Sequence, residues 1–284
     1  MPRALPGEKL MAKILGLLLL GVIGLVGLRL WDAREDQSEW ARLRGLQPED
    51  PKKYDPKMVA HLPEPAQRYF NFAIKPGTPL YTVAEIEMEG EFSLGTQAEP
   101  NYQKMKADQI LASPAGFVWR LSLPGRVPVS GSDSGQWTRF RIFGLIPVAR
   151  QGGDQDHGRS AFGRHVAESV FWTPAALLPS PWVLWEKIND HTARVTVSHE
   201  GHSQAVDVEV EPNGQLTRVV FQRWSNANPE KAFRLQPFGG DLRDFREVQG
   251  FQVPFDVEAG NMYGTPDYFV FFKAKIRSIR FQAE

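Results

Sequence analysis

The feature that most limits how this chain can fold is a run of fifteen uncharged residues, 14–28. With its flanking residues, the run approaches the roughly 20 residues that a helix needs to cross about 30 Å of hydrocarbon. A single segment inside a membrane satisfies its backbone hydrogen bonds only as a helix. We therefore predict a transmembrane helix over residues 13–31, preceded by a tail of residues 1–12.

Charged residues around the run indicate its orientation. Arg3, Lys9 and Lys13 precede it, and the positive-inside rule then places the N-terminus in the cytoplasm. The exit, Leu28-Arg29-Leu30-Trp31-Asp32, lacks the small residues of a cleavage site, so we expect a permanent anchor; a cleaved signal is the alternative. The predicted location is a bacterial inner membrane, crossed once, with the C-terminal domain on the periplasmic or extracellular side.

The charge and cysteine content exclude some classes of protein. Residues 1–31 carry four basic side chains and one acidic one, so residues 32–284 keep 29 basic and 32 acidic side chains. That balance argues against nucleic-acid binding, which needs a basic face. The chain has no cysteine, which excludes a disulfide framework and a thiol nucleophile. No motif indicates a cofactor or a metal, and no feature indicates an oligomeric state.

The segment after the predicted span is charged and then rich in proline. We interpret residues 32–56 as a juxtamembrane stalk and a linker, and residues 57–284 as the exported α+β domain. Apolar residues near the start of that domain recur at helical spacing but are interrupted by proline. Two short helical pieces are therefore predicted, the second at Glu64–Ala73.

From about residue 79 the apolar period changes from helical to alternating. Thr82, Ala84, Ile86 and Met88 alternate with mostly acidic residues, as in a strand with one solvated face. Most gaps between such segments are short and carry turn residues, so neighbouring strands should pair antiparallel. Further strands are predicted at residues 102–112, 116–123, 136–143, 193–199, 205–211, 215–224, 241–248, 251–259 and 268–281.

One segment breaks this alternation. Residues 160–178 place an apolar set on one helical face, and Pro174 should end or kink that helix near Thr173. The predicted fold class is α+β and mainly β. It consists of a single N-terminal transmembrane helix, followed by a curved antiparallel sheet, or half-barrel, with one or two helices packed on its concave face.

Three segments carry a family resemblance. They are Leu62-Pro63-Glu64-Pro65-Ala66-Gln67-Arg68-Tyr69-Phe70, then Gly116-Phe117-Val118-Trp119-Arg120, and finally Glu168 with Phe171-Trp172-Thr173-Pro174-Ala175-Ala176-Leu177-Leu178-Pro179. These segments resemble an uncharacterised bacterial family of membrane-anchored, β-rich exported domains of unknown function. The resemblance covers most of residues 60–280 and implies no mechanism.

A second resemblance lies near the C-terminus. The segment Phe245-Arg246-Glu247-Val248-Gln249-Gly250-Phe251-Gln252-Val253-Pro254-Phe255-Asp256-Val257-Glu258 is similar to a hairpin of periplasmic lipoprotein carriers, the LolA-like half-barrel proteins. In those proteins a half-closed barrel with helices beneath it holds lipid acyl chains. Any antiparallel hairpin with a glycine turn and an edge proline shares this pattern.

One polar cluster is a candidate catalytic site. In the predicted helix, His165 and Glu168 lie one turn apart, and Asp156 and His157 precede its start. The four side chains would then form a proton-transfer or metal-assisted site. The alternative is a surface loop whose acidic residues favour the helix N-terminus, with Glu168 paired to Arg164. We favour this alternative, because the cluster has no recognised metal-ligand spacing.

The domain carries more aromatic surface than a small sheet needs. Core packing is the simplest explanation, and a lined cavity between sheet and helix is the alternative. For such a cavity, the candidate ligand-binding residues are Phe117, Trp119, Phe140, Phe162, Val166, Phe171 and Trp172.

The leading functional hypothesis is a membrane-tethered exported domain that binds an apolar or lipid-like ligand between sheet and helix. One alternative is a hydrolytic or metal-dependent enzyme that uses the polar cluster. Another is a non-enzymatic envelope scaffold or interaction domain. Because no strong catalytic signature is present, the sequence favours binding over catalysis. The expected partners are the membrane, through the N-terminal helix, and a lipid or apolar small molecule.

Overall fold

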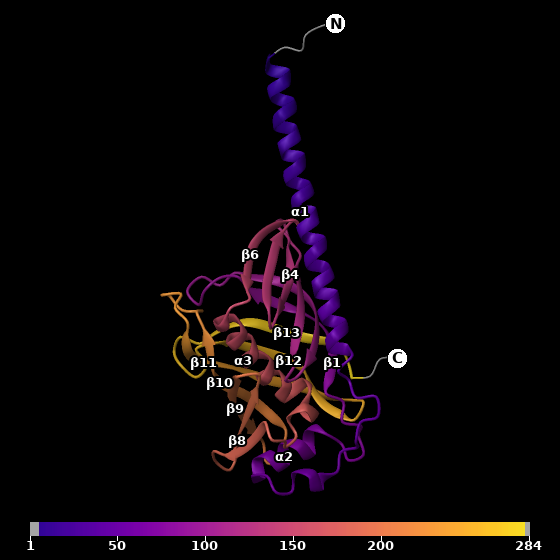
Figure 1. The fold of residues 1–284 in the computed structure, drawn as a ribbon. Helices are drawn as coiled ribbons and strands as arrows, with labels where there is room; N and C mark the ends of the chain where they lie inside the picture. The colour runs from indigo at the N-terminus through magenta and orange to yellow at the C-terminus, as the bar shows by residue number, and fades with distance from the viewer. Residues whose placement is uncertain (1–5, 282–284) are drawn as a thin grey trace.

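A computed structural model describes residues 6–281 of the chain (Figure 1). Its helices are α1 (Pro6–Arg44), α2 (Glu64–Ala73) and α3 (Gln155–Trp172), and 3₁₀ turns lie at Pro56–Val59 and Pro174–Leu177. Its strands are β1 (Val83–Ser93), β2 (Tyr102–Ala112), β3 (Gly116–Leu123), β4 (Val129–Ser134), β5 (Trp137–Ile142), β6 (Ile146–Gly152), β7 (Val183–Lys187), β8 (Thr192–His199), β9 (His202–Val210), β10 (Leu216–Ser225), β11 (Arg234–Val248), β12 (Phe251–Asn261) and β13 (Phe269–Arg280).

The strands form one antiparallel sheet in the order β6-β5-β4-β3-β2-β1-β13-β12-β11-β10-β9-β8-β7. Neighbours in the sheet are neighbours in the chain, except that β1 pairs with β13 and so joins the first strand to the last. The edges are β6 and β7, so the sheet is open. The predicted fold class is confirmed: the chain is mainly β, with a long apolar N-terminal helix and a large open antiparallel sheet.

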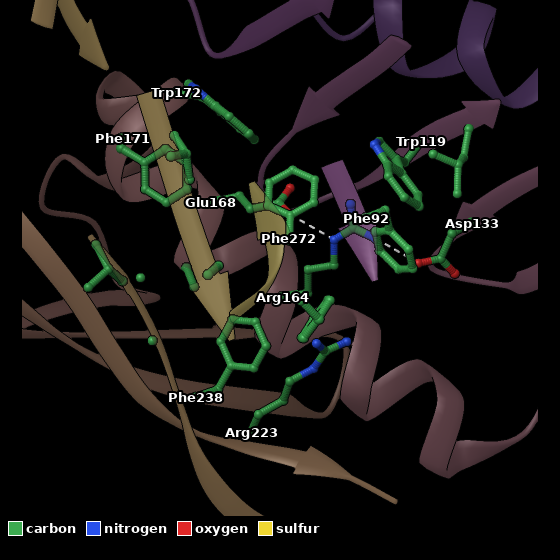
Figure 2. A pocket seen from close by; sticks show the side chains of 18 of the residues that line it. Phe92, Trp119, Asp133, Arg164, Glu168, Phe171, Trp172, Arg223, Phe238 and Phe272 are labelled. Atoms are coloured by element: carbon green, nitrogen blue, oxygen red, sulfur yellow. Dashed lines mark hydrogen bonds and ion pairs between the residues drawn. The ribbon is translucent and has the colours of Figure 1, made fainter. Parts of the chain in front are cut away.

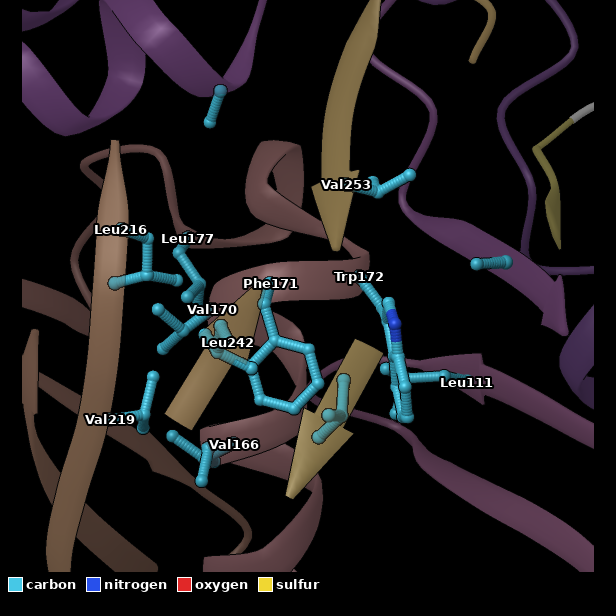
Figure 3. Packing of buried hydrophobic residues seen from close by; sticks show 14 of the residues in the cluster. Leu111, Val166, Val170, Phe171, Trp172, Leu177, Leu216, Val219, Leu242 and Val253 are labelled. Carbon is cyan, nitrogen blue, oxygen red and sulfur yellow. The ribbon is translucent and has the colours of Figure 1, made fainter. Parts of the chain in front are cut away.

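The helix α3 connects the two edge strands and therefore crosses one face of the sheet, which we call the inner face (Figure 1). Its apolar side packs into the main core with residues of β2, β10, β11 and β12 (Figure 3). The helix α2 lies on the same side, where the Tyr69 hydroxyl donates a hydrogen bond of 2.6 Å to the carbonyl of Val170 in α3. The bounds predicted for α2 are confirmed.

The helix α1 runs without a break from the apolar run into the domain (Figure 1). Its last turns lie on the outer face of the sheet, where a second hydrophobic cluster contains Leu43, Val83, Ile110, Ala112 and Val118. Residues 32–44, interpreted from sequence as a stalk, are therefore helical and docked on the sheet. Of the predicted tail, residues 1–5 lie outside the described part of the chain.

Buried ion pairs also hold α1 against the sheet. Asp32 is only 2% exposed. Its carboxylate lies 2.6 Å from Arg150 of β6 and 3.2 Å from Arg139 of β5, and it also contacts Arg141 of β5. Charged groups removed from water are stable only when paired in this way. The orientation of α1 relative to the domain is therefore set by specific contacts.

Several element boundaries differ from the sequence prediction. The helix α3 begins at Gln155 instead of residue 160, because the Asp154 carboxylate accepts a hydrogen bond of 2.8 Å from the backbone N–H of His157 and caps the helix. Its end at Trp172, just before Thr173 and Pro174, agrees with the prediction. Strands β4, β6 and β7 were not predicted, and β11 begins at Arg234 instead of residue 241.

Candidate functional site

A cavity of about 460 Å³, the inner pocket, lies between α3 and the inner face of the sheet (Figure 2). The helix α3 contributes side chains that recur at helical spacing, namely Arg164, Ala167, Glu168, Phe171 and Trp172. Strands β3–β6 line the pocket from one half of the sheet, and β10–β13 line it from the other half. The sheet therefore bends around the space beside α3.

Most of the pocket lining is apolar, and its aromatic rings contact one another. The ring centroid of Trp119 lies 5.9 Å from that of Phe92 and 6.4 Å from that of Phe272. Phe238 and Phe271, 6.0 Å apart, continue the wall. A concave, mostly apolar surface with a few polar groups is typical of a small-molecule site. The pocket can hold a hydrocarbon group away from water.

One wall of the pocket carries a saturated ionic network centred on Arg164 (Figure 2). Its Nε donates to Glu168 at 2.7 Å, and its Nη1 donates to Asp133 at 2.7 Å. The amide of Gln109 donates to the other oxygen of Glu168 at 2.5 Å. Burial opposes the charge on Arg164, but the two carboxylates outweigh it and raise its pKa. The predicted pairing of Glu168 with Arg164 is confirmed.

Two charged residues of the pocket wall, Asp133 and Arg223, were missed by the sequence reasoning. In β10, Val219, Phe221 and Arg223 occupy alternate positions and all line the pocket. In β4, Val129 and Asp133 share a face in the same way. A sequence signal for both residues was available: each lies at an even spacing from apolar residues of its own strand, so its side chain points to the same face of the sheet as theirs.

The predicted ligand-binding residues divide into two groups. Trp119, Phe140, Phe171 and Trp172 line the inner pocket. Phe117, Phe162 and Val166 are buried in the main hydrophobic core and are not part of the pocket lining. A role in ligand binding stays a prediction for all seven residues, of which the last three do not line the inner pocket.

The predicted polar cluster occupies separate environments. Asp156 accepts a hydrogen bond of 2.8 Å from the Trp224 indole, and the His157 Nε2 lies 3.1 Å from the Thr138 hydroxyl. Only Glu168 of the four lines the inner pocket. Across residues 10–281, whose side chains are described, no group of three or more histidine or acidic side chains is arranged to hold a metal ion.

The fourth member, His165, is enclosed in the core. It is 4% exposed, and its ring lies 5.0 Å from Phe162 and 6.2 Å from Phe117. Burial lowers the pKa of His165 to about 3, and the backbone of Pro114 opposes this effect only in part. The imidazole is therefore neutral near pH 7, so it does not act there as a cationic acid.

The fold and the pocket together define a class of protein: an open antiparallel sheet that wraps a helix and encloses an apolar pocket beside it. The chain belongs to a family of unknown function, DUF6544, whose model matches residues 52–274. The predicted membership of a family of unknown function is thereby confirmed. The curated proteins gave no match to this chain.

Two solved structures are similar in outline, in agreement with the weaker predicted resemblance. A LolA superfamily protein from Nitrosomonas europaea has a TM-score of 0.42 and 8% identity, over 78% of this chain and 93% of that one. A domain described as an outer membrane lipoprotein-sorting protein, from Vibrio parahaemolyticus, has a TM-score of 0.36 and 11% identity, over 80% of this chain and 92% of that one.

Proposed function

We propose that this protein is a membrane-tethered domain that binds an apolar or lipid-like ligand in the inner pocket. The observation that carries the proposal is the pocket itself, about 460 Å³ of mostly apolar space beside α3. A well-packed core leaves few voids larger than a water molecule, so a space of this size favours a bound ligand. The ionic network around Arg164 gives the pocket one polar wall.

The tether in this proposal is α1. Among the described residues it is the one helix long and apolar enough to cross a membrane, and its apolar window has no buried residue. The sequence at its exit lacks a cleavage site, and its charge asymmetry favours a cytoplasmic N-terminus with the domain exported from a bacterial cell. A helix that is both membrane-spanning and docked on the sheet would hold the pocket close to a bilayer.

Native mass spectrometry of the full chain, released from detergent, tests the binding proposal. We expect a retained lipid adduct on the wild-type chain and a roughly 10-fold lower occupancy in Ala167→Trp, because the indole would fill space that the ligand uses. Ala149→Trp, on edge strand β6, fills the same pocket from the other side. It serves as a second variant in case Ala167→Trp disturbs folding.

Ala98→Trp, in an exposed loop, is the matched control for this experiment. Lipid that adheres to α1 should be present to the same extent in all variants. The measured quantity is therefore the lipid that the wild type and Ala98→Trp retain and the two pocket variants lose. If the wild type carries no more bound lipid than Ala167→Trp and Ala149→Trp, the proposal is wrong.

A further inference from the structure

Arg223 differs from Arg164 in lacking a partner within the pocket. Its Nε is buried without a hydrogen bond, and no carboxylate within the described residues lies within 4.0 Å of its guanidinium. The nearest recorded contact of that group is the face of the Phe238 ring, 5.0 Å away. Figure 2 shows the side chain rising from the sheet toward Arg164. The pocket therefore contains one cation with no anion of its own.

The electrostatic state of Arg223 agrees with this geometry. Burial, and then repulsion from Arg164, lower its pKa to about 10, so the group is still positively charged at neutral pH. Asp133 and Glu168 favour the charge from a distance, but both already accept hydrogen bonds from Arg164. Arg223 is half-buried, and its Nε is shielded from water without a hydrogen bond, so a ligand anion in the pocket would supply the partner that this guanidinium lacks.

We propose that the inner pocket binds an anionic amphiphile whose hydrocarbon chain lies among the aromatic rings and whose carboxylate or phosphate pairs with Arg223. This inference rests on the proposed binding function and names its ligand class. Arginine suits the role because its planar fork of donors matches the oxygens of either anion. Neutral lipids of the same chain length would bind, but more weakly.

The test compares cis-parinaric acid with its methyl ester, two fluorescent probes that differ in the charged group. Each is titrated into the full chain in phosphatidylcholine nanodiscs at pH 7.5, with empty nanodiscs subtracted. We expect the wild type to bind the acid about 10-fold more tightly than the ester, as one charge-assisted contact predicts. Arg223→Gln should bring the acid to the affinity of the ester and leave the ester unchanged.

Arg218→Gln is the matched control, because Arg218 lies on the same strand but on the exposed face. Displacement of the probe by oleate or by oleoyl lysophosphatidate then separates a carboxylate ligand from a phosphate ligand. Equal affinities of acid and ester in the wild type, or an acid preference that survives Arg223→Gln, would overturn the inference while leaving apolar binding intact. Failure of both probes to bind would remove the proposed function as well.

A separate observation concerns the hairpin tip, residues 143–148, which comprises the turn between β5 and β6 and the first three residues of β6. Arg29, which directly follows the apolar run of α1, donates a hydrogen bond to the carbonyl of Gly144. Figure 1 shows this end of the sheet beside α1, at the point where the helix leaves the domain. If the apolar run spans a membrane, the hairpin tip lies at the level where the helix emerges.

The hairpin tip is apolar and exposed. Phe143, Ile146 and Val148 are 58%, 47% and 56% exposed. Phe143 also has a φ of 53°, in the left-handed region where a bulky residue is rare, and Gly144 follows it with a φ of 65°. A hairpin turn of type I′ needs a positive φ at both central positions, and a phenylalanine is unusual there because asparagine, aspartate and glycine accept that conformation more easily.

We infer that the hairpin tip contacts the bilayer surface and holds one side of the inner pocket against it. Val148 belongs to both features, since it is exposed at the tip and lines the pocket. The inference rests on the proposed tether, because Arg29 fixes the height of the tip relative to the span. An apolar ligand could then pass between bilayer and pocket without crossing bulk water.

Because the chain has no cysteine, single cysteines can be labelled with an environment-sensitive fluorophore in nanodiscs that contain spin-labelled lipids. Labels at Phe143→Cys and Ile146→Cys should be quenched to at least about half the extent of a label at Leu20→Cys in the span. A label at Leu184→Cys, equally exposed on the opposite edge strand β7, should not be quenched.

Quenching at residue 20 without quenching at 143 or 146 would overturn the bilayer contact and leave the tether standing. No quenching at residue 20 would remove the tether and the contact together. The label at residue 146 keeps the test valid if Phe143→Cys changes the conformation of the turn.

Discussion

Replacing Asp32 by alanine is expected to lower the free energy of unfolding of the domain by about 3 to 5 kcal/mol. Its carboxylate is 2% exposed and contacts three arginines of β5 and β6. Burial, and then repulsion from Arg150 and Arg29, already lower the pKa of Arg141. Without Asp32, Glu35 would remain as a partner for Arg139 at 2.6 Å, and the other two cations would lose theirs.

Urea unfolding of the full chain in detergent measures this effect, with hydrogen exchange of β5 and β6 reporting whether α1 stays docked. The matched control is Glu39→Gln, which removes an ion pair with Arg42 on the same helix. Because Arg42 is half-exposed, that loss should be below about 1 kcal/mol. An Asp32→Ala variant as stable as Glu39→Gln would show that the buried cluster does not hold α1 to the sheet.

Lowering the pH from 7.5 to 4.5 is expected to destabilise the domain by about 2 to 3 kcal/mol through His165 alone. In the folded chain burial keeps the pKa of His165 at about 3, whereas in the unfolded chain it returns to about 6.5. The unfolded state therefore binds one more proton between these values. Stability falls as the pH decreases through 6.5 and continues to fall until about pH 3.

Chemical denaturation at several pH values, compared between wild type and His165→Gln, isolates this contribution. The glutamine does not titrate, so the pH-dependent loss should be smaller in the variant by about 2 to 3 kcal/mol at pH 4.5. His61→Gln, at an exposed position, should follow the wild type. Parallel pH profiles for wild type and His165→Gln would contradict burial of a neutral imidazole.

The surroundings of Asp32 and His165 could not be predicted from the sequence. Asp32 follows the apolar run and was assigned to the juxtamembrane stalk, because nothing local indicates that three arginines more than a hundred positions away surround it. His165 was a candidate catalytic group because it lies one turn from Glu168. The helix turns the two side chains into different surroundings, one toward the core and one toward the pocket.

The missed strands share a physical cause. The strand β4 is rich in serine, glycine and aspartate, and β6 lies at an edge with Pro147 near its start and most of its residues exposed. Neither has the apolar alternation that marks a half-buried strand. Both form because hydrogen bonds to a neighbouring strand are available, which is a property of the assembled sheet.

The sequence by itself determined the apolar helix, the helix α2, most of the strands and the antiparallel class of the fold. Those features depend on the spacing of apolar residues, on prolines and on turn residues, all of which are local. The tertiary structure decided the docking of α1, the ionic network around Arg164 and the lone cation Arg223 in an apolar pocket. These depend on which distant strands meet across the curved sheet. The alternation of Val219, Phe221 and Arg223 indicates a shared face of the strand, but it does not reveal whether that face packs solidly or borders a pocket.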